Sequence, residues 1–250
     1  MTKSTAEDIA VELLHEAATS GRHLAELPAA SRPASVAEAH AIQDRLVRRS
    51  GKAVAGWKVS TAADGEVMYG AIYAEDCHPS PAVVAASKYR LMGIEAEIAF
   101  RFKDNLPPRE RNYSRDELTG VLAPFPVFEI VDSRFASYAD TAPIIRLADR
   151  MSNGAMVMGR AEGEVPADLA AIHVRLAING TTVLQQVGGH LRKDPFLPAI
   201  EFVNARQKTQ HFASGEFITC GTFTGLRFAE AGEVYEVEFD GLGSVRLTIA

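Results

Sequence analysis

Two apolar stretches are the most informative part of this chain: GIEAEIAF at residues 93–100 and PVFEIVDSR at residues 126–134. Both read as β-strands, and both carry glutamates. Side chains alternate across a strand, so Glu95 and Glu97 share one face of the first stretch. Glu129 lies in the second stretch, about thirty residues further along the chain.

Of the three glutamates, Glu129 lies in the most apolar stretch of sequence. Val127 and Val131 share its face, while Phe128 and Ile130 line the opposite face. A strand that is apolar on both faces is usually central and covered. A charged carboxylate there needs a compensating charge, and a divalent cation bound by oxygen ligands would supply one.

The E-x-E pattern by itself does not prove a metal site, because the chain contains it three times. Glu162 and Glu164 lie in AEGEVP, which reads as a surface loop. Glu236 and Glu238 lie in VYEVEF, which the turn DGLG joins to SVRLTI in a hairpin with one wet face. There the glutamates are expected to face Arg246 and solvent, the commoner setting for strand glutamates.

Composition bounds the class of protein. The 250 residues fit one sizeable domain, with 47% hydrophobic and 23% charged residues. The net charge of −6 argues against nucleic acid as a partner. No stretch reads as a membrane span or a signal peptide, and two cysteines are too few for a disulfide framework. We therefore expect a cytoplasmic protein.

The chain changes character near residue 52. Residues 1–52 read as helices, the second of which starts with a capping box of Ser35 and Glu38. Residues 53–250 read as a β-rich core, and together the two parts form one domain. This order predicts an α+β fold with a mixed sheet and peripheral helices.

Within the core, Asn179-Gly180 is a strong signal for a hairpin turn. Helices are expected after Asp194-Pro195 and from Ser114 to Val121, where Ser114 and Glu117 form a second capping box. The remaining short strands are expected in AVAGWKVS, YGAIYA, AMVMG, HVRLAI, TTVLQQV and EFITCG.

Several familiar motifs are absent. The sequence has no zinc-protease H-E-x-x-H and no G-x-S-x-G nucleophile elbow, and GTFTGL at residues 221–226 does not match a phosphate loop. His23 and Glu26 form H-x-x-E, which offers a base pair on a helical lid or two surface residues near a helix end.

Taken together, nine segments resemble the hydratase/decarboxylase branch of the fumarylacetoacetate hydrolase superfamily, which includes 2-keto-4-pentenoate hydratase and 4-oxalocrotonate decarboxylase. They run in the family's order and cover nearly the whole chain. The segments are RPASVAEAHAIQDRLV, AGWKVS, YGAIY, GIEAEIAF, PVFEIVDSRF, LADRMSNGAMVMG, DPFLPAIEFVN, GEFITCGTFTG and FDGLGSVRLTI.

The resemblance implies an N-terminal helical segment and a β-rich core with a divalent ion, usually Mg²⁺, with Mn²⁺ as the alternative. At the matching positions, Glu95, Glu97 and Glu129 would hold the ion, and Lys58 of AGWKVS would be the active lysine. The family's substrates are 2-oxo acids or their enols, which suit a hard cation that accepts oxygen ligands.

Four further residues are candidates. Asp76 lies near a family acidic position, and Ser152 matches a family serine. Asp132 and Arg134 either orient the site, bind a substrate carboxylate or form a structural ion pair.

The chain also departs from the family pattern. The family commonly continues GWKV with G-L-T-S, whereas this chain reads GWKVSTAADGEVMYG. Asn153 stands where many members have a second serine, and Glu233 replaces a usual aspartate. The metal trio and Lys58 remain, but the surface that would border the substrate differs.

The leading hypothesis is a magnesium-dependent lyase that adds water to a short 2-hydroxydienoate such as 2-hydroxypenta-2,4-dienoate, in aromatic catabolism. The rivals are a decarboxylase of 2-oxo-3-hexenedioate, a C–C hydrolase of acylpyruvates that uses His23 and Glu26 as its base, and a silent partner subunit. The family implies a homo-oligomer and allows a complex with a related decarboxylase or hydratase subunit.

Overall fold

The computed structural model describes residues 5–62, 64–160 and 163–250. Glu162 of the loop E-x-E pair lies outside the described residues, and its neighbour Glu164 is exposed in irregular structure, as expected. Over the described residues the fold is the α+β class that the sequence predicts, with two mixed sheets and peripheral helices.

The helices among the described residues are α1 (Ala6–Ser20), α2 (Val36–Ser50), α3 (Arg115–Val121), α4 (Pro143–Ala148) and α5 (Phe196–Arg206). The strands among them are β1 (Val54–Thr61), β2 (Val67–Tyr73), β3 (Cys77–Pro79), β4 (Ala82–Val84), β5 (Gly93–Phe102), β6 (Leu122–Val131), β7 (Asn153–Met158), β8 (His173–Ile178), β9 (Thr181–Val187), β10 (Phe217–Thr222), β11 (Arg227–Phe228), β12 (Val234–Phe239) and β13 (Gly243–Ile249).

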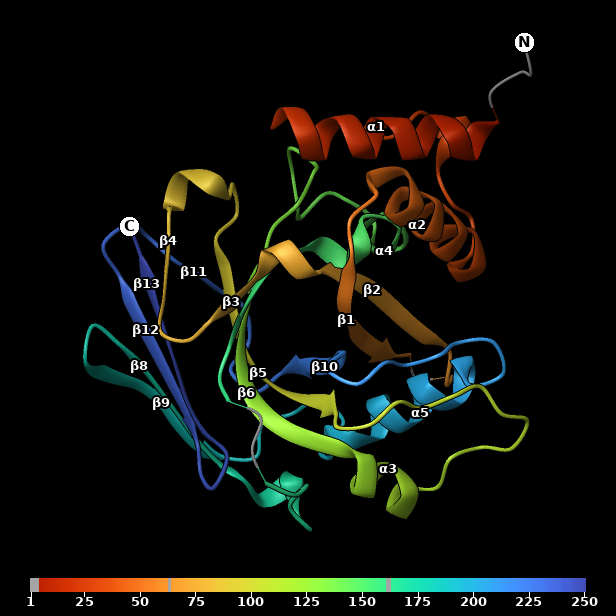
Figure 1. The fold of residues 1–250 in the computed structure, drawn as a ribbon. Coiled ribbons are helices and arrows are strands. Elements are labelled where there is room, and N and C mark those ends of the chain that lie inside the picture. Colours follow the sequence, from red (N-terminus) through yellow and green to blue (C-terminus); the bar gives the residue numbers. More distant parts are fainter. Residues whose placement is uncertain (1–4, 63, 161–162) are drawn as a thin grey trace.

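The larger sheet has the strand order β2-β1-β10-β5-β6-β7-β3, with β11 also paired to β5. The smaller sheet has the order β4-β13-β12-β8-β9. The pairs β1/β10, β3/β7 and β4/β13 are parallel and their neighbours are antiparallel, so both sheets are mixed. Figure 1 shows the smaller sheet at the left of the larger one. Helices α1 and α2 lie at the top, above α4, and helices α3 and α5 lie at the bottom.

The centre of the larger sheet is the pair β5/β6. It runs in continuous antiparallel register from Gly93↔Val131 to Phe102↔Leu122. Every residue of β6 is buried, as the apolar sequence predicts. One face of the sheet packs against α5 and the smaller sheet through pairs such as Phe100–Phe196 and Phe128–Tyr235. We call the opposite face, onto which Lys58, Glu95, Glu97 and Glu129 project, the glutamate face.

The expected hairpins are confirmed. Asn179 and Gly180 join β8 to β9 with φ of 52° and 78°, the positive values that a type I′ turn requires. In the hairpin β12/β13, Glu236 pairs with Arg246 as expected. Glu238 instead pairs with Arg175 of β8, because β8 is the other neighbour of β12. These glutamates lie on a wet face and serve below as controls.

The three helices predicted after residue 30 are confirmed as α2, α3 and α5, although one of the two predicted capping boxes is partial. The Ser114 hydroxyl and the Glu117 carboxylate form a complete capping box at α3. At α2 the Ser35 hydroxyl accepts from the Glu38 N–H, but the Glu38 carboxylate accepts from the Ala34 N–H. Only one of the two hydrogen bonds of the predicted capping box is therefore formed.

The interpretation of His23 and Glu26 as a base pair on a helical lid is wrong. Gly21 ends α1 in the left-handed conformation, and Leu24 then bridges to Phe135 in an extended stretch. Glu26 pairs with Arg32 on the surface. The proposed base pair of a hydrolase is therefore not assembled in this structure.

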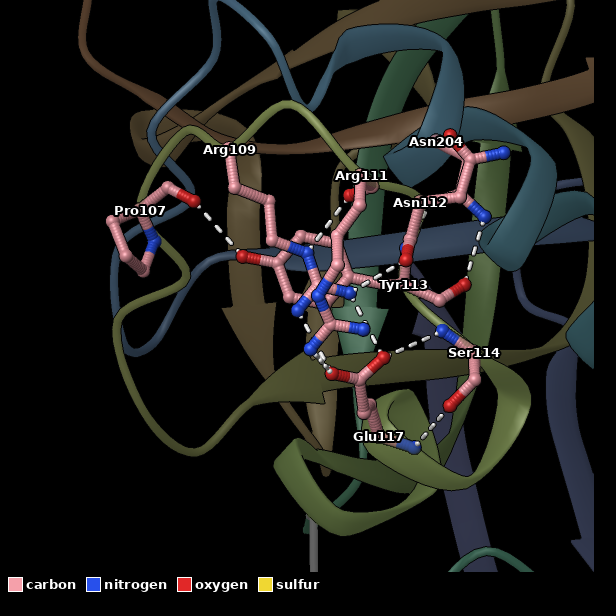
Figure 2. A network of polar contacts seen from close by, with 8 residues as sticks. All are labelled: Pro107, Arg109, Arg111, Asn112, Tyr113, Ser114, Glu117 and Asn204. Carbon is pink, nitrogen blue, oxygen red and sulfur yellow. Dashed lines mark hydrogen bonds and ion pairs between the residues drawn. The ribbon is translucent and has the colours of Figure 1, made fainter.

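A polar network attaches the loop before α3 to helix α5 (Figure 2). Arg109 donates two hydrogen bonds to Glu117 and stacks 3.2 Å from the centre of the Tyr113 ring. Asn204 of α5 accepts from the Tyr113 N–H and donates to the Tyr113 carbonyl. Hydrogen bonds from Arg109 and from the Ser114 backbone hold the pKa of Glu117 well below its usual value. The network stabilises the side of the sheet away from the glutamate face.

Gln43 of α2 joins the helical segment to the sheet. Its amide nitrogen donates to the carbonyls of Tyr69 and Leu147, and its amide oxygen accepts from the Ala71 N–H at 2.8 Å. The side chain thereby caps part of the open edge of β2, an edge that would otherwise leave backbone groups unpaired. None of the helices in the described part of the chain has both the length and the apolar composition of a membrane span.

Replacement of Gln43 by Ala is expected to lower the free energy of unfolding by about 2–4 kcal/mol, because it leaves one buried N–H and two carbonyls without their partner. Chemical denaturation measures the change. The control is Gln185→Ala on the exposed edge strand β9, which is expected to change stability by less than about 0.5 kcal/mol. Equal, small effects of both substitutions would contradict the role given to Gln43.

Candidate metal centre

The pairing of β5 with β6 brings the three glutamates together. Glu95 and Glu129 are direct cross-strand partners, and Glu97 follows Glu95 by two residues on the same face. One carboxylate oxygen of each glutamate lies within 4.8 Å of those of the other two. Glu97 and Glu129 are completely buried, and Glu95 keeps a small exposed area. The cluster that the sequence predicts is therefore formed.

Lys58 of β1 reaches the same cluster across β10. Its Nζ lies 2.8 Å from Glu129 Oε2 and 3.7 Å from Glu95 Oε2. Burial opposes the charge on Lys58, but Glu129, Glu95 and Glu97 together raise its pKa above the ordinary lysine value. Lys58 therefore contributes a fixed positive charge beside three carboxylates.

A bulge in β10 holds Glu97. The register of β10 against β5 shifts between Thr219 and Thr222, and Gly221 there has a φ of 109°. The bulge points the Gly221 N–H at Glu97 Oε2, 3.2 Å away, and the Thr219 hydroxyl donates to the same oxygen. Both donors hold one oxygen of Glu97, which leaves Oε1 free on the other side of the carboxylate.

Asn153 of β7 orients Glu129 from the opposite direction. The Asn153 amide nitrogen donates to Glu129 Oε1 at 3.0 Å, while Lys58 lies against Oε2. Asn153 is completely buried, so its contact is not shared with solvent. The residue that departs from the family serine thus holds one of the three carboxylates.

The segment before β7 has an unusual backbone. Arg150, Met151 and Ser152 have φ of 51°, 52° and 59°, in the left-handed region that costs about 1–2 kcal/mol for each residue with a side chain. Such strain persists where the surroundings over-determine it. The turn places Ser152 at a cavity beside Lys58, where its buried hydroxyl has no hydrogen-bond partner among the described residues.

Arg134 holds both ends of this strained turn. Its guanidinium donates to the carbonyls of Asp149 and Asn153 at 2.7 and 2.9 Å, and its Nε donates to the Asp149 carboxylate. Both members of the ion pair are buried. Arg134 is therefore paired with Asp149 and not with Asp132, whose carboxylate accepts from the N–H groups of Arg90 and Leu91.

Lys58 and the four further candidate residues line two separate cavities. Lys58 and Ser152 line a cavity of about 240 Å³ between the glutamate face and α4. Asp76, Asp132 and Arg134 line a larger cavity of about 440 Å³ beneath α1. Although the second cavity is larger, Lys58 does not line it. The structure therefore does not bring Asp76 to the side chain of Lys58.

The donor set suits a divalent metal ion. Burial, and then the neighbouring Glu129 and Glu95, raise the pKa of Glu97 to about 8, and burial raises the pKa of Glu95. Among the described residues, Glu97 Oε1 is buried without a hydrogen-bond partner. Three carboxylates exceed the single charge of Lys58, and a hard divalent cation with oxygen ligands would balance the remainder.

This arrangement predicts a pH-dependent response to cations. The folded pKa of Glu97 lies above the unfolded value of 4.5, so the cation-free protein loses stability as the pH rises from about 5 to 8. A bound cation needs the ionised carboxylate, so stabilisation by Mg²⁺ is expected to grow over the same interval. Chemical denaturation with Mg²⁺ and with chelator measures both trends.

The control for this prediction is Glu97→Gln, which removes the titrating group and should flatten both trends. If Mg²⁺ stabilised the unmodified protein equally at pH 5 and pH 8, the assignment of Glu97 as a ligand would be wrong.

The fold and the buried glutamate cluster define a protein built around a candidate divalent-metal centre. The family model of the fumarylacetoacetate (FAA) hydrolase C-terminal region matches residues 35–250. The chain therefore belongs to the fumarylacetoacetate hydrolase family, as the sequence segments predict.

Individual relatives agree with this assignment. The chain is 25% identical over 259 residues to a 2-keto-4-pentenoate hydratase of Paraburkholderia xenovorans (strain LB400), covering 98% of this chain and 95% of the relative. It is 26% identical over 223 residues to a 4-oxalocrotonate decarboxylase of Pseudomonas putida, covering 84% and 83% of the two chains.

Solved structures show the same fold. The 4-oxalocrotonate decarboxylase from Pseudomonas putida G7, complexed with calcium and acetate, has a TM-score of 0.80 at 22% identity and covers 100% of this chain and 99% of its own. The same enzyme complexed with magnesium and adipate has a TM-score of 0.79 at 22% identity, with 96% of each chain covered.

Proposed function

We propose that this protein is a divalent-metal-dependent lyase that acts on a short 2-hydroxydienoate or 2-oxo acid, with Mg²⁺ as the first choice of metal. Addition of water, as to 2-hydroxypenta-2,4-dienoate, is the first reaction to test. The observation that carries the proposal is the contact of Lys58 with the buried cluster of Glu95, Glu97 and Glu129, beside a cavity of about 240 Å³. The relatives named hydratase support it, because they match almost the whole chain.

The protein's own groups suit this chemistry. A divalent cation held by the three carboxylates would supply Lewis-acid polarisation of the 2-oxo group. Lys58 places a positive charge beside the incoming carboxylate, and its ammonium group can donate a proton to the carbon skeleton as the enol converts to the keto form. Ser152, whose buried hydroxyl lacks a partner among the described residues, is suited to orient the water that adds to the conjugated alkene.

The remaining candidate residues have supporting parts in this proposal. Arg134 orients the site by holding the backbone on both sides of Ser152. Asp132 fixes the segment at Arg90 and Leu91. Asp76 stays a candidate acid-base residue of the larger cavity, next to the strained turn.

A decarboxylase is the second candidate function. It requires the same site, and it is favoured by the similarity of fold to a 4-oxalocrotonate decarboxylase over the whole chain. Release of carbon dioxide from 2-oxo-3-hexenedioate would distinguish it from a hydratase. Homo-oligomeric assembly, a complex with a related subunit and a cytoplasmic location remain parts of the proposal, and light scattering of the purified protein tests the first of them.

The ligand assignment predicts a sharp loss of activity. Glu97→Gln or Glu129→Gln is expected to lower metal-dependent kcat by at least about 1,000-fold, because each removes a negatively charged ligand from a buried site. The assay follows the dienol absorbance of freshly made 2-hydroxypenta-2,4-dienoate with Mg²⁺ and with chelator. Glu236→Gln, in the exposed E-x-E pair, is the matched control and should retain full activity.

Full activity of Glu97→Gln or Glu129→Gln would show that the assignment of that glutamate as a metal ligand is wrong. No turnover by folded, metal-loaded wild-type protein would remove this substrate, and the same variants would then be tested for carbon dioxide release.

A separate prediction concerns Lys58. Because its ammonium group and a cation compete for Glu129 and Glu95, Lys58→Met is expected to bind Mn²⁺ about tenfold more tightly while kcat falls by at least about 100-fold. Calorimetric titration and the dienol assay measure the two effects, with the exposed Lys208→Met as the control. Weaker Mn²⁺ binding by Lys58→Met would indicate that Lys58 only supports the structure of the cluster.

A further inference from the structure

The cavity beside Lys58 has two different walls. The glutamate face contributes Lys58, Ser60 and Met68 from β1 and β2. The opposite wall is formed by α4 and its flanking segments, which contribute the side chains Tyr138, Pro143, Arg146, Leu147, Met151 and Ser152. A substrate held at the glutamates through Lys58 would therefore extend along the wall that carries α4.

Arg146 is the charged residue of that second wall. Its guanidinium lies 4.6 Å from the centre of the Tyr138 ring, and it is half-buried. Among the residues that the structure describes, it has no carboxylate partner and its side chain makes no hydrogen bond. Arg134 and Arg150, in contrast, both donate to protein carbonyls nearby.

Stacking on an aromatic ring preserves the ability of an arginine to bind an anion. The ring contacts the flat face of the guanidinium and leaves the N–H donors in its plane free for a bidentate carboxylate. Tyr138 therefore restricts Arg146 to a small set of orientations at the cavity without occupying its donors.

The balance of charge around the cavity also favours an anion. Lys58 and Arg146 are its charged lining residues among those described, and none of the lining residues is acidic. The charge of Lys58 is balanced by Glu129 and Glu95, which leaves that of Arg146 without compensation. Ser152 adds a buried hydroxyl without a partner among the described residues.

We propose that Arg146 determines the substrate class by binding a second carboxylate, at the end of the substrate remote from Lys58. The substrate would then be a short 2-oxo or 2-hydroxydienoate diacid. This inference rests on the proposed function for the placement of the first carboxylate, and it assigns a specificity role to a residue of α4 that does not touch the reacting atoms.

Binding without turnover gives the first test. Calorimetric titration of the Mg²⁺-loaded protein compares adipate, a saturated six-carbon diacid, with hexanoate, the monoacid of equal length. Arg146→Gln is expected to weaken adipate binding about 10- to 100-fold and hexanoate binding less than about threefold, as expected for loss of a charge-assisted bidentate contact. Arg48→Gln, an exposed arginine of α2 outside the cavity, is the control.

Turnover gives the second test. The ratio of kcat/KM for 2-hydroxyhexa-2,4-dienedioate to that for 2-hydroxypenta-2,4-dienoate is expected to fall about 10- to 100-fold in Arg146→Gln. Equal losses of kcat/KM on both substrates would show that Arg146 binds the shared carboxylate, and unchanged kcat/KM values for both substrates would show that it binds neither; each result overturns the proposal.

The binding test separates failure of this inference from failure of the proposed function. If the wild-type protein turned over neither substrate but Arg146→Gln still lost the preference for adipate, the subsite would stand and the proposed reaction would fall. Tyr138 adds a graded check, since Tyr138→Phe keeps the ring under Arg146 and should keep the preference for adipate. Tyr138→Ala removes the ring and should lose about 3- to 10-fold of that preference. Equal adipate preference in Tyr138→Ala and the unmodified protein would contradict the stacking argument.

Discussion

The main physical constraint on this structure is that it buries more negative charge than its own basic side chains neutralise. Three carboxylates lie together on the glutamate face, two of them completely buried, and Lys58 balances only part of their charge. A buried carboxylate without compensation is strongly unfavourable, so a folded protein must protonate it, pair it or bind a cation. The raised pKa of Glu97 shows the first response, its pairing with Thr219 and Gly221 is the second, and the free Oε1 leaves room for the third.

Much of the surrounding fold holds the cluster in place. The continuous register of β5 and β6 sets Glu95 opposite Glu129, and the bulge at Gly221 points a backbone donor at Glu97. On the other side, Arg134 and Asp149 keep a strained left-handed turn in place, so that Ser152 and Asn153 face the site. A preorganised site of this kind fixes its ligands before the cation arrives, and its stability is drawn from packing elsewhere in the core.

The sequence predicts the metal cluster because period-two alternation and an apolar strand are local signals. Glu129 stands out within PVFEIVDSR, and the exposed Glu236 and Glu238 show what the same E-x-E spacing does on a wet face. The supporting donors are different, because Thr219 and Gly221 reach Glu97 only through a bulge between strands more than a hundred residues apart in sequence. The sequence also does not predict that Arg134 pairs with Asp149 or that Asp76 lines the larger cavity, because both outcomes depend on how the chain turns between strands.

We expect substrate specificity to depend on the cavity walls more than on the glutamate cluster. In the proposed function, the glutamates and Lys58 would serve any short 2-oxo acid. Arg146 and Tyr138 lie on the wall that carries α4, which would contact the part of the substrate remote from Lys58. Anomalous diffraction from crystals grown with Mn²⁺ would test whether the buried glutamates form a divalent-cation site. We expect an anomalous peak bounded by Glu95, Glu97 and Glu129, with Lys58 displaced from its contact with Glu129. A crystal with no peak at this position, and with Lys58 still seated against Glu129, would contradict it.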